Sequence, residues 1–178
     1  MTGAPAYVRT GRLDVLGANR LGSALYSPVL DGQTLPVNLA RFLFLDPRAS
    51  DFYVDWEKAA NDAVAILRGE AGRDPYDRRL SDLIGELSTR SEELGTRWAA
   101  HNVRLHRTGR KRYHHPVAGD LELTYEALEL PADTGLTIIT YTAEPGSAAH
   151  DALSFLASWT TEHHQPDQAA TVQADDEA

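Results

Sequence analysis

The chain has 178 residues, 42% of them hydrophobic, and a formal net charge of −9, which suits one domain with a single core. The absence of cysteine excludes disulfides and thiolate metal sites, and the acidic balance argues against nucleic-acid binding by this chain alone. No apolar run approaches the roughly 20 residues that span a bilayer, and no secretion signal begins the chain, so we expect a soluble cytoplasmic protein without a membrane partner.

The first part of the chain is predicted to form a β-hairpin followed by short helices. Two alternating runs over residues 6–19 flank a Thr-Gly pair, which is typical of a hairpin. Residues 20–26 have the pattern of a short helix that ends at a Ser-Pro pair. Asn38 is a suitable N-cap for an apolar helix over residues 39–45.

Three longer helices are predicted next. Apolar side chains recur every three or four residues over residues 47–68, with Asp46 as the cap and Gly69 after the end. Asp74 is predicted to cap a second helix because a proline follows it and an apolar stripe begins soon after. Ser91, followed by two glutamates, is predicted to cap the third.

After His101 the hydrophobic period falls from about four residues to two, which predicts β-strands. The expected strands cover residues 103–108, 111–115, 120–130 and 136–142. The doubled apolar pair Ala127-Leu128 interrupts the alternation and predicts a bulge. Short turns between the strands favour an antiparallel meander.

The end of the chain is predicted to be one helix and a tail. Ser147 can cap the closing helix, and residues 161–178 are charged with almost no large apolar residue, which is typical of a disordered acidic tail. Residues 1–160 would then form the folded domain. The element order predicts an α+β fold in which helices pack on one face of an antiparallel sheet of about five strands.

A basic segment over residues 101–116 stands out in this acidic chain. It contains four histidines, four arginines and one of the two lysines of the chain, and no acidic residue. This composition indicates a site for an anionic group.

Several sequence segments resemble a known family. They are LDPRASDFYVDWE at residues 45–57, WAAHNVR at residues 98–104 and HHPVAGDLEL at residues 114–123, in this order within a match over residues 6–159. The chain is similar to the ligand-binding domain of the MmyB-like transcription regulators of actinobacteria.

The resemblance implies a PAS-like fold, in which a five-stranded antiparallel sheet and helices on one face enclose an apolar cavity. It also implies a fatty-acid-like ligand and a sensory role in a regulator whose Xre-type helix-turn-helix domain lies before this module. No helix-turn-helix precedes Ala6, so we expect contact with DNA only through that missing domain. Either the chain is part of a longer regulator or it is a stand-alone sensor; we favour the first.

An acyl ligand needs a cation for its carboxylate at the cavity mouth. Arg104, Arg112 and His115 are the candidates from the basic segment, with His101 as a fourth. Each of them could instead pair with surface Asp and Glu, and the basic stripe could lie along a DNA backbone beside the missing domain.

The cavity wall is expected to consist of large apolar side chains. The candidates are Phe42, Phe44, Trp56, Leu67, Trp98, Tyr125, Ile138 and Tyr141. Each of these residues alone is more simply a core residue, and only the resemblance predicts that some of them surround a ligand.

Other classes of function have weaker support. The histidines lack metal-ligand spacing and no catalytic motif occurs, so we expect no metal, no cofactor apart from a bound fatty acid or similar lipid, and no enzyme activity. His115 and Asp120 or Glu122 would be the candidate acid–base pair of an enzyme, but any protein surface can show such a pairing by chance. The alternative function is a ligand-free module that forms a homodimer of the regulator, which a cavity too small for an acyl chain would favour.

Overall fold

A computed structural model describes residues 3–100 and 107–163, and its centre is a curled antiparallel sheet. The strands are β1 (Ala6–Thr10), β2 (Asp14–Ala18), β3 (Val37–Asn38), β4 (Thr108–His115), β5 (Gly119–Glu129) and β6 (Leu136–Thr142). Their order across the sheet is β3-β2-β1-β6-β5-β4. The α+β prediction is confirmed, with six strands instead of about five because β3 adds a two-residue edge strand beside β2. The other five strands, in the order β2-β1-β6-β5-β4, have the arrangement of a PAS-like sheet.

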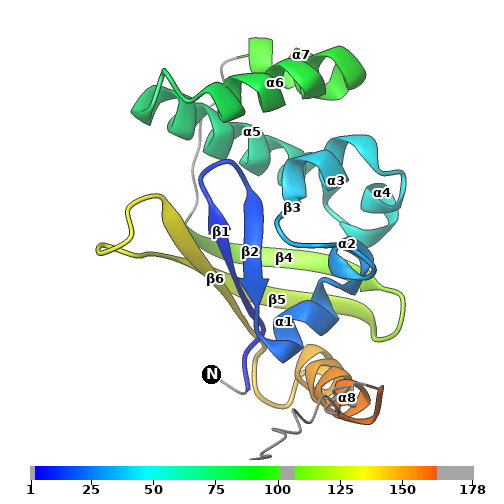
Figure 1. Ribbon diagram of the computed structural model, residues 1–178. Coiled ribbons are helices and arrows are strands. Elements are labelled where there is room, and N and C mark those ends of the chain that lie inside the picture. Colours follow the sequence, from blue (N-terminus) through cyan, green and yellow to red (C-terminus); the bar gives the residue numbers. More distant parts are fainter. Residues whose placement is uncertain (1–2, 101–106, 164–178) are drawn as a thin grey trace, which may run out of the picture.

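Eight helices lie around this sheet in the described part of the chain. They are α1 (Arg20–Leu25), α2 (Ser27–Leu30), α3 (Leu39–Leu45), α4 (Arg48–Phe52), α5 (Trp56–Arg73), α6 (Arg78–Arg90), α7 (Glu92–Ala99) and α8 (Ala148–His163). Figure 1 shows α5, α6 and α7 stacked beyond the turn of the β1–β2 hairpin, and α8 at the opposite end. The predicted closing helix therefore continues to His163, beyond the expected start of the tail.

Three helix caps predicted from the sequence are confirmed. The Asn38 side chain accepts a hydrogen bond from the Arg41 amide at 3.0 Å. Ser91 accepts from the Leu94 amide at 3.2 Å, and Ser147 accepts from the His150 amide at 3.2 Å. These caps satisfy backbone donors that a helix leaves open at its first turn, which is why the local sequence predicts them well.

The predicted single helix over residues 47–68 is wrong. It is divided into α4 and α5 at Tyr53–Asp55 because this segment pairs with the edge of β4: Tyr53 forms a β-bridge with Tyr113, and the Val54 amide donates to the Arg112 carbonyl at 3.2 Å. The apolar residues keep a spacing of three or four positions across the break. Tertiary packing, rather than a continuous helix, keeps their side chains on one side.

Two further predictions about these elements are also wrong. The α5 helix continues through Gly69 to Arg73, and the cap of α6 is Asp77 instead of Asp74. The Asp77 carboxylate accepts from the Arg79 and Leu80 amides at 2.9 and 3.2 Å.

The predicted bulge at Ala127-Leu128 is absent. Pairing of β5 with β6 continues in one register from Thr124 opposite Thr142 to Glu129 opposite Thr137. Ala127 faces the interior and Leu128, 44% exposed, faces outward, so the doubled apolar pair reflects an exposed leucine. A register shift occurs instead between β1 and β2, at Val8 and Arg9.

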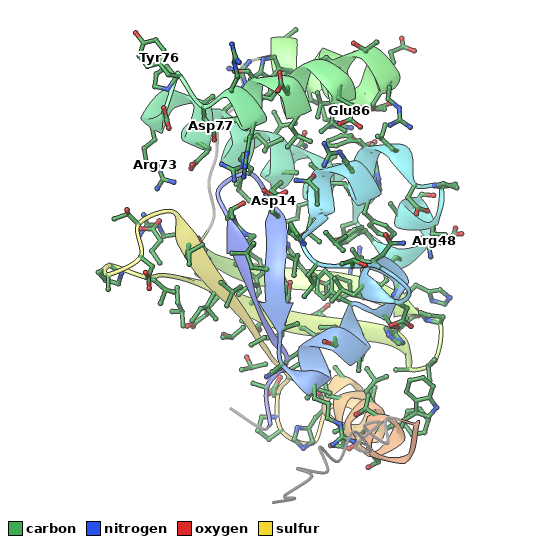
Figure 2. The ribbon with its side chains drawn as sticks, in the orientation of Figure 1. Asp14, Arg48, Arg73, Tyr76, Asp77 and Glu86 are labelled. Atoms are coloured by element: carbon green, nitrogen blue, oxygen red, sulfur yellow. The ribbon has the colours of Figure 1, made fainter. Side chains whose placement is uncertain are left out.

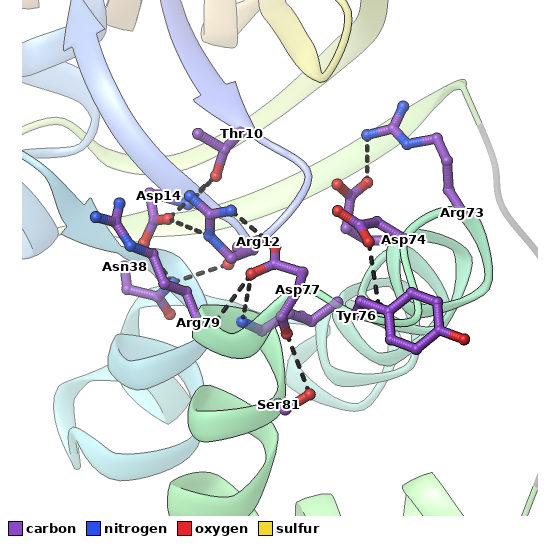
Figure 3. Close-up of polar contacts among 12 residues, drawn as sticks. Thr10, Arg12, Asp14, Asn38, Arg73, Asp74, Tyr76, Asp77, Arg79 and Ser81 are labelled. Carbon is purple, nitrogen blue, oxygen red and sulfur yellow. Dashed lines mark hydrogen bonds and ion pairs between the residues drawn. The ribbon is translucent and has the colours of Figure 1, made fainter.

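The turn of the β1–β2 hairpin is tied to the helices beside it (Figure 3). Arg12 donates to Asp77 at 2.8 Å and to Asp14 at 3.3 Å. Asn38 donates to the Arg12 carbonyl and to the Asp14 carboxylate, both at 2.8 Å. Arg12 thus joins the hairpin to the start of α6. This contact fixes the position of the hairpin turn, at the end of the sheet where β1 and α5 approach each other.

Candidate functional site

A cavity of about 200 Å³ lies between the inner face of the sheet and the helices α3 and α5. Its apolar wall consists of Tyr7, Leu13, Tyr26, Leu39, Leu43, Tyr53, Ala59, Ala63, Ile66, Tyr125, Ala127 and Ile139, together with Thr137. Its charged lining consists of Arg9, Asp62, Arg107, Lys111 and Glu129. Charged groups in an otherwise apolar hollow are the arrangement expected of a small-molecule site.

The charges around this cavity do not cancel. Asp62 pairs with Lys58 at 3.0 Å, and Glu129 pairs with Arg107 at 3.0 Å. Within residues 3–100 and 107–163, Arg9 and Lys111 have no ion pair with a carboxylate. The cavity therefore faces two cations whose charge no described carboxylate balances in direct contact.

Arg9 and Lys111 are positioned by the alternation of their strands. Arg9 follows Tyr7 on the inner face of β1, is only 7% exposed, and donates from Nη1 to the Thr10 carbonyl at 3.0 Å. Lys111 precedes Tyr113 on the inner face of β4, and its Nζ lies 4.9 Å from the centre of the Tyr125 ring. That ring lies across Gly109, where a side chain would come within 3.2 Å of it.

The Lys111 ammonium is destabilised by its surroundings. Burial lowers its pKa to about 8, with Lys58 and Arg9 acting in the same direction and Asp62 opposing them. A bound anion would reverse this effect, because an opposite charge in contact favours the protonated amine. Electrostatics alone thus favour a negatively charged occupant.

A second hollow of about 420 Å³ adjoins the first and shares Arg9, Ile66, Glu129 and Thr137 with it. It lies between the end of α5, the β1–β2 turn and the β5–β6 turn. Figure 2 shows Arg73 extending from the end of α5 toward the β5–β6 hairpin, and its guanidinium lies near Gly135. This hollow therefore extends the cavity toward the β5–β6 turn.

Three buried tyrosines form a hydrogen-bonded group, of which Tyr26 lines the cavity. The hydroxyl oxygens of Tyr26, Tyr113 and Tyr141 are mutually hydrogen-bonded at 2.6 to 3.0 Å, and each residue is at most 1% exposed. Burial raises the pKa of all three phenols well above its ordinary value. We call this group the tyrosine triangle. Because Tyr26 also lines the cavity, the triangle fixes part of the cavity wall.

Comparison with known protein families matches residues 1–156 to the MmyB-like transcription regulator ligand binding domain. The chain belongs to this family. No match to a curated protein was found. The cavity described above is accordingly a cavity within the ligand-binding domain of a transcription regulator. In the part of the chain that the structure describes, no helix is long and apolar enough to cross a membrane.

Two of the four basic residues predicted at the mouth of this ligand-binding domain's cavity, Arg112 and His115, do not line it. Arg112 points to the opposite side of β4 from Lys111, is exposed, and donates from Nε to Asp55 at 2.8 Å. Arg104 and His101 lie outside the described residues. Strand alternation explains the difference for Arg112, because adjacent strand residues face opposite sides.

His115 is buried and has a structural role in the turn after β4. Its Nδ1 accepts from the Val117 and Ala118 amides, both at 3.1 Å, so Nε2 carries the proton and donates to the Ala24 carbonyl at 2.9 Å. Burial lowers the pKa of this imidazole. The ring is thus a neutral connector between the turn and α1, and it does not line the cavity.

Among the predicted wall residues, Tyr125 lines the cavity. Phe42, Leu67 and Tyr141 are buried core residues outside the lining, and Ile138 lies on the other face of β6 from the lining residues Thr137 and Ile139.

The remaining predicted wall residues pack among the helices. Phe44 contacts Trp56 edge to face at 6.1 Å, and the Trp56 indole donates to the Leu43 carbonyl at 3.0 Å. Trp98 lies under the Arg68 guanidinium, 4.7 Å from its ring centre. These aromatic residues therefore pack among α3, α5 and α7 and do not line this cavity.

Sequence reasoning missed Arg9 and Lys111 as site residues. Both were visible as cations on the apolar face of a strand: Arg9 alternates with Tyr7, and Lys111 alternates with Tyr113. The prediction followed the number of arginines in the basic segment. The informative signal was instead the face of the strand on which each residue lies, because alternate residues of a strand face opposite sides.

Proposed function

We propose that this domain binds an amphipathic small molecule with an anionic head group, of the fatty-acid-like class, and thereby modulates DNA binding by an attached helix-turn-helix domain. The observation that supports this proposal is the pair of cations, Arg9 and Lys111, that line a largely apolar cavity and have no ion pair with a carboxylate among the described residues. A carboxylate head would neutralise this excess charge, and the apolar part would fill the hollow between sheet and helices.

The energetics of such a ligand follow from its two parts. Each methylene removed from water contributes about 0.8 kcal/mol, and hydrogen bonds to a charged group contribute about 1.5 to 3 kcal/mol. Regulation requires in addition that the ligand prefers one arrangement of the whole regulator, because a ligand of equal affinity for both arrangements shifts neither.

Replacement of the cavity cation tests the proposal. Lys111→Met should weaken binding of a carboxylate by about tenfold or more, because it removes a charged hydrogen-bond donor. Thermal shift and calorimetric titration with hexanoate, decanoate and palmitate measure the effect. Arg112→Met is the matched control, since Arg112 is the next residue of the same strand but faces solvent. No binding of any of these acids, or equal losses in both variants, would refute the proposal.

The affinity for a carboxylate should also depend on pH through Lys111. Only the protonated amine attracts the anion, and its pKa in the empty cavity is about 8. Affinity should therefore be constant below this pH and fall by up to about tenfold per pH unit above it. Titrations over this range with the wild type and Lys111→Met check the expectation, and a pH profile that the substitution leaves unaltered contradicts it.

The alternative role is a ligand-free dimerisation module. A long acyl chain cannot lie wholly inside a cavity of about 200 Å³, and this small volume is the observation that favours the alternative. The titrations distinguish the two roles, because a module with no ligand would bind none of the acids and would show its function as a concentration-dependent dimer in sedimentation experiments.

A further inference from the structure

We infer that the ligand of this cavity is a compact carboxylate carrying one aromatic ring, of about the size of benzoate, rather than a long acyl chain. The inference rests on the anion site of the proposed function, and it replaces the acyl chain of that proposal with a compact aromatic group.

The volume of the cavity limits the part of a ligand that the cavity itself can enclose. A cavity of about 150 Å³ in a protein core accommodates benzene, or about 25 Å³ for each non-hydrogen atom. On this scale the 200 Å³ of the present cavity accommodates about eight non-hydrogen atoms. Benzoate, with nine non-hydrogen atoms, is close to this number, whereas the chain of palmitate would need about twice the volume.

The wall of the cavity favours a flat aromatic ring. Four tyrosines line it, Tyr7, Tyr26, Tyr53 and Tyr125. The rings of Tyr7 and Tyr26 already meet edge to face at 4.9 Å, an arrangement that a ligand ring can extend. The Tyr26 hydroxyl is engaged within the tyrosine triangle.

The positions of the charges favour a short ligand whose head lies inside. Lys111 and Arg9 both line the cavity, so a carboxylate can approach both from within. A long chain that is anchored there and extends into the adjoining hollow would pass Arg9 and the Glu129–Arg107 ion pair, and then Glu70 and Arg73. Such a path exposes methylenes to charged groups, whereas a single ring remains among the tyrosines.

Calorimetric titration of the purified chain with benzoate, benzamide and palmitate tests this inference. We expect benzoate to bind, benzamide to bind at least about tenfold more weakly because it lacks the charge, and palmitate to bind more weakly than benzoate. Lys111→Met should reduce benzoate affinity to about that of benzamide, and Arg112→Met should leave it unchanged.

A second variant tests the volume directly. Ala59→Leu, in α5 at the cavity wall, adds three carbons, which occupy about 75 Å³ and leave less space than benzene requires. This variant should lose the response to benzoate while keeping or raising the melting temperature of the free protein, because it fills a void. If it does not fold, the Lys111→Met titration still decides the role of the charge.

The possible results separate the inference from the function on which it rests. Tighter binding of palmitate than of benzoate, or unaltered benzoate binding in folded Ala59→Leu, overturns the compact aromatic ligand and leaves the anion site standing. Absence of binding by benzoate, palmitate and every other carboxylate overturns both.

Discussion

Raising the pH above about 10 should unfold this domain in one cooperative step. Five buried phenols have a raised pKa: the three of the tyrosine triangle, Tyr53, and Tyr125, whose pKa burial raises to about 12. In the unfolded chain the same phenols ionise near pH 10. The unfolded state then binds fewer protons than the folded state, so the free energy of unfolding falls as pH rises through this value.

The size of the alkaline effect follows from the number of tyrosines. Each phenol that stays protonated only in the folded state removes up to about 1.4 kcal/mol of stability per pH unit. Five of them together reach a typical total stability of about 5 to 15 kcal/mol within about one to two pH units. Loss of far-ultraviolet circular dichroism and growth of tyrosinate absorbance should therefore coincide.

A control for this experiment is provided by Tyr76, which is 95% exposed in the loop between α5 and α6 and is labelled in Figures 2 and 3. Tyr76→Phe should leave the midpoint of the transition unchanged. Gradual ionisation of the buried phenols in a protein that keeps its circular dichroism would show that the tyrosine triangle is accessible, contrary to its burial.

The elements that the sequence predicted well are those set by local chemistry. The strand over residues 136–142 has the predicted bounds, and the caps at Asn38, Ser91 and Ser147 lie where a side chain can accept from its own first turn. In these places the alternation or the cap is complete within a few residues, so no distant contact is needed to decide it.

The failures occur where distant segments meet. The break between α4 and α5 depends on Tyr53 pairing with Tyr113, which no local pattern shows. The tyrosine triangle joins residues separated by 87 and 115 positions, so the sequence shows Tyr26 only as one more aromatic residue of a short helix.

The site itself was half predictable. The resemblance and the basic segment predicted an apolar interior with cations at its entrance, and in the structure three cationic side chains, Arg9, Arg107 and Lys111, line a cavity. Their identity was missed because Arg112 and Lys111 are neighbours in the sequence but face opposite sides of β4, while Arg9 lies far from the basic segment. A count of charges does not distinguish the two faces of a strand, whereas the alternation of residues along the strand does.

Truncation of Tyr113 should cause one of the largest losses of stability of any single substitution in the domain. Tyr113 is fully buried, and its ring lies 5.0 Å from Phe52 and 5.9 Å from Tyr26, measured between ring centres. Tyr113→Ala removes these contacts and leaves a cavity beside the sheet, at a cost of about 3 to 5 kcal/mol. Urea unfolding, followed by fluorescence and circular dichroism, measures the difference.

The variant Tyr113→Phe separates the contribution of the packed ring to stability from the contribution of the hydroxyl group. It keeps the packing but opens the tyrosine triangle: Tyr26 and Tyr141 can still bond each other at 2.6 Å, yet one of their hydroxyls loses its acceptor. A buried donor without a partner costs about 1 to 3 kcal/mol, so this variant should lose less stability than Tyr113→Ala. The exposed control Tyr76→Ala should stay within about 0.5 kcal/mol of the wild type. Equal losses in Tyr113→Phe and Tyr113→Ala would mean that the hydroxyl network, rather than the packed ring, carries the stability of this region.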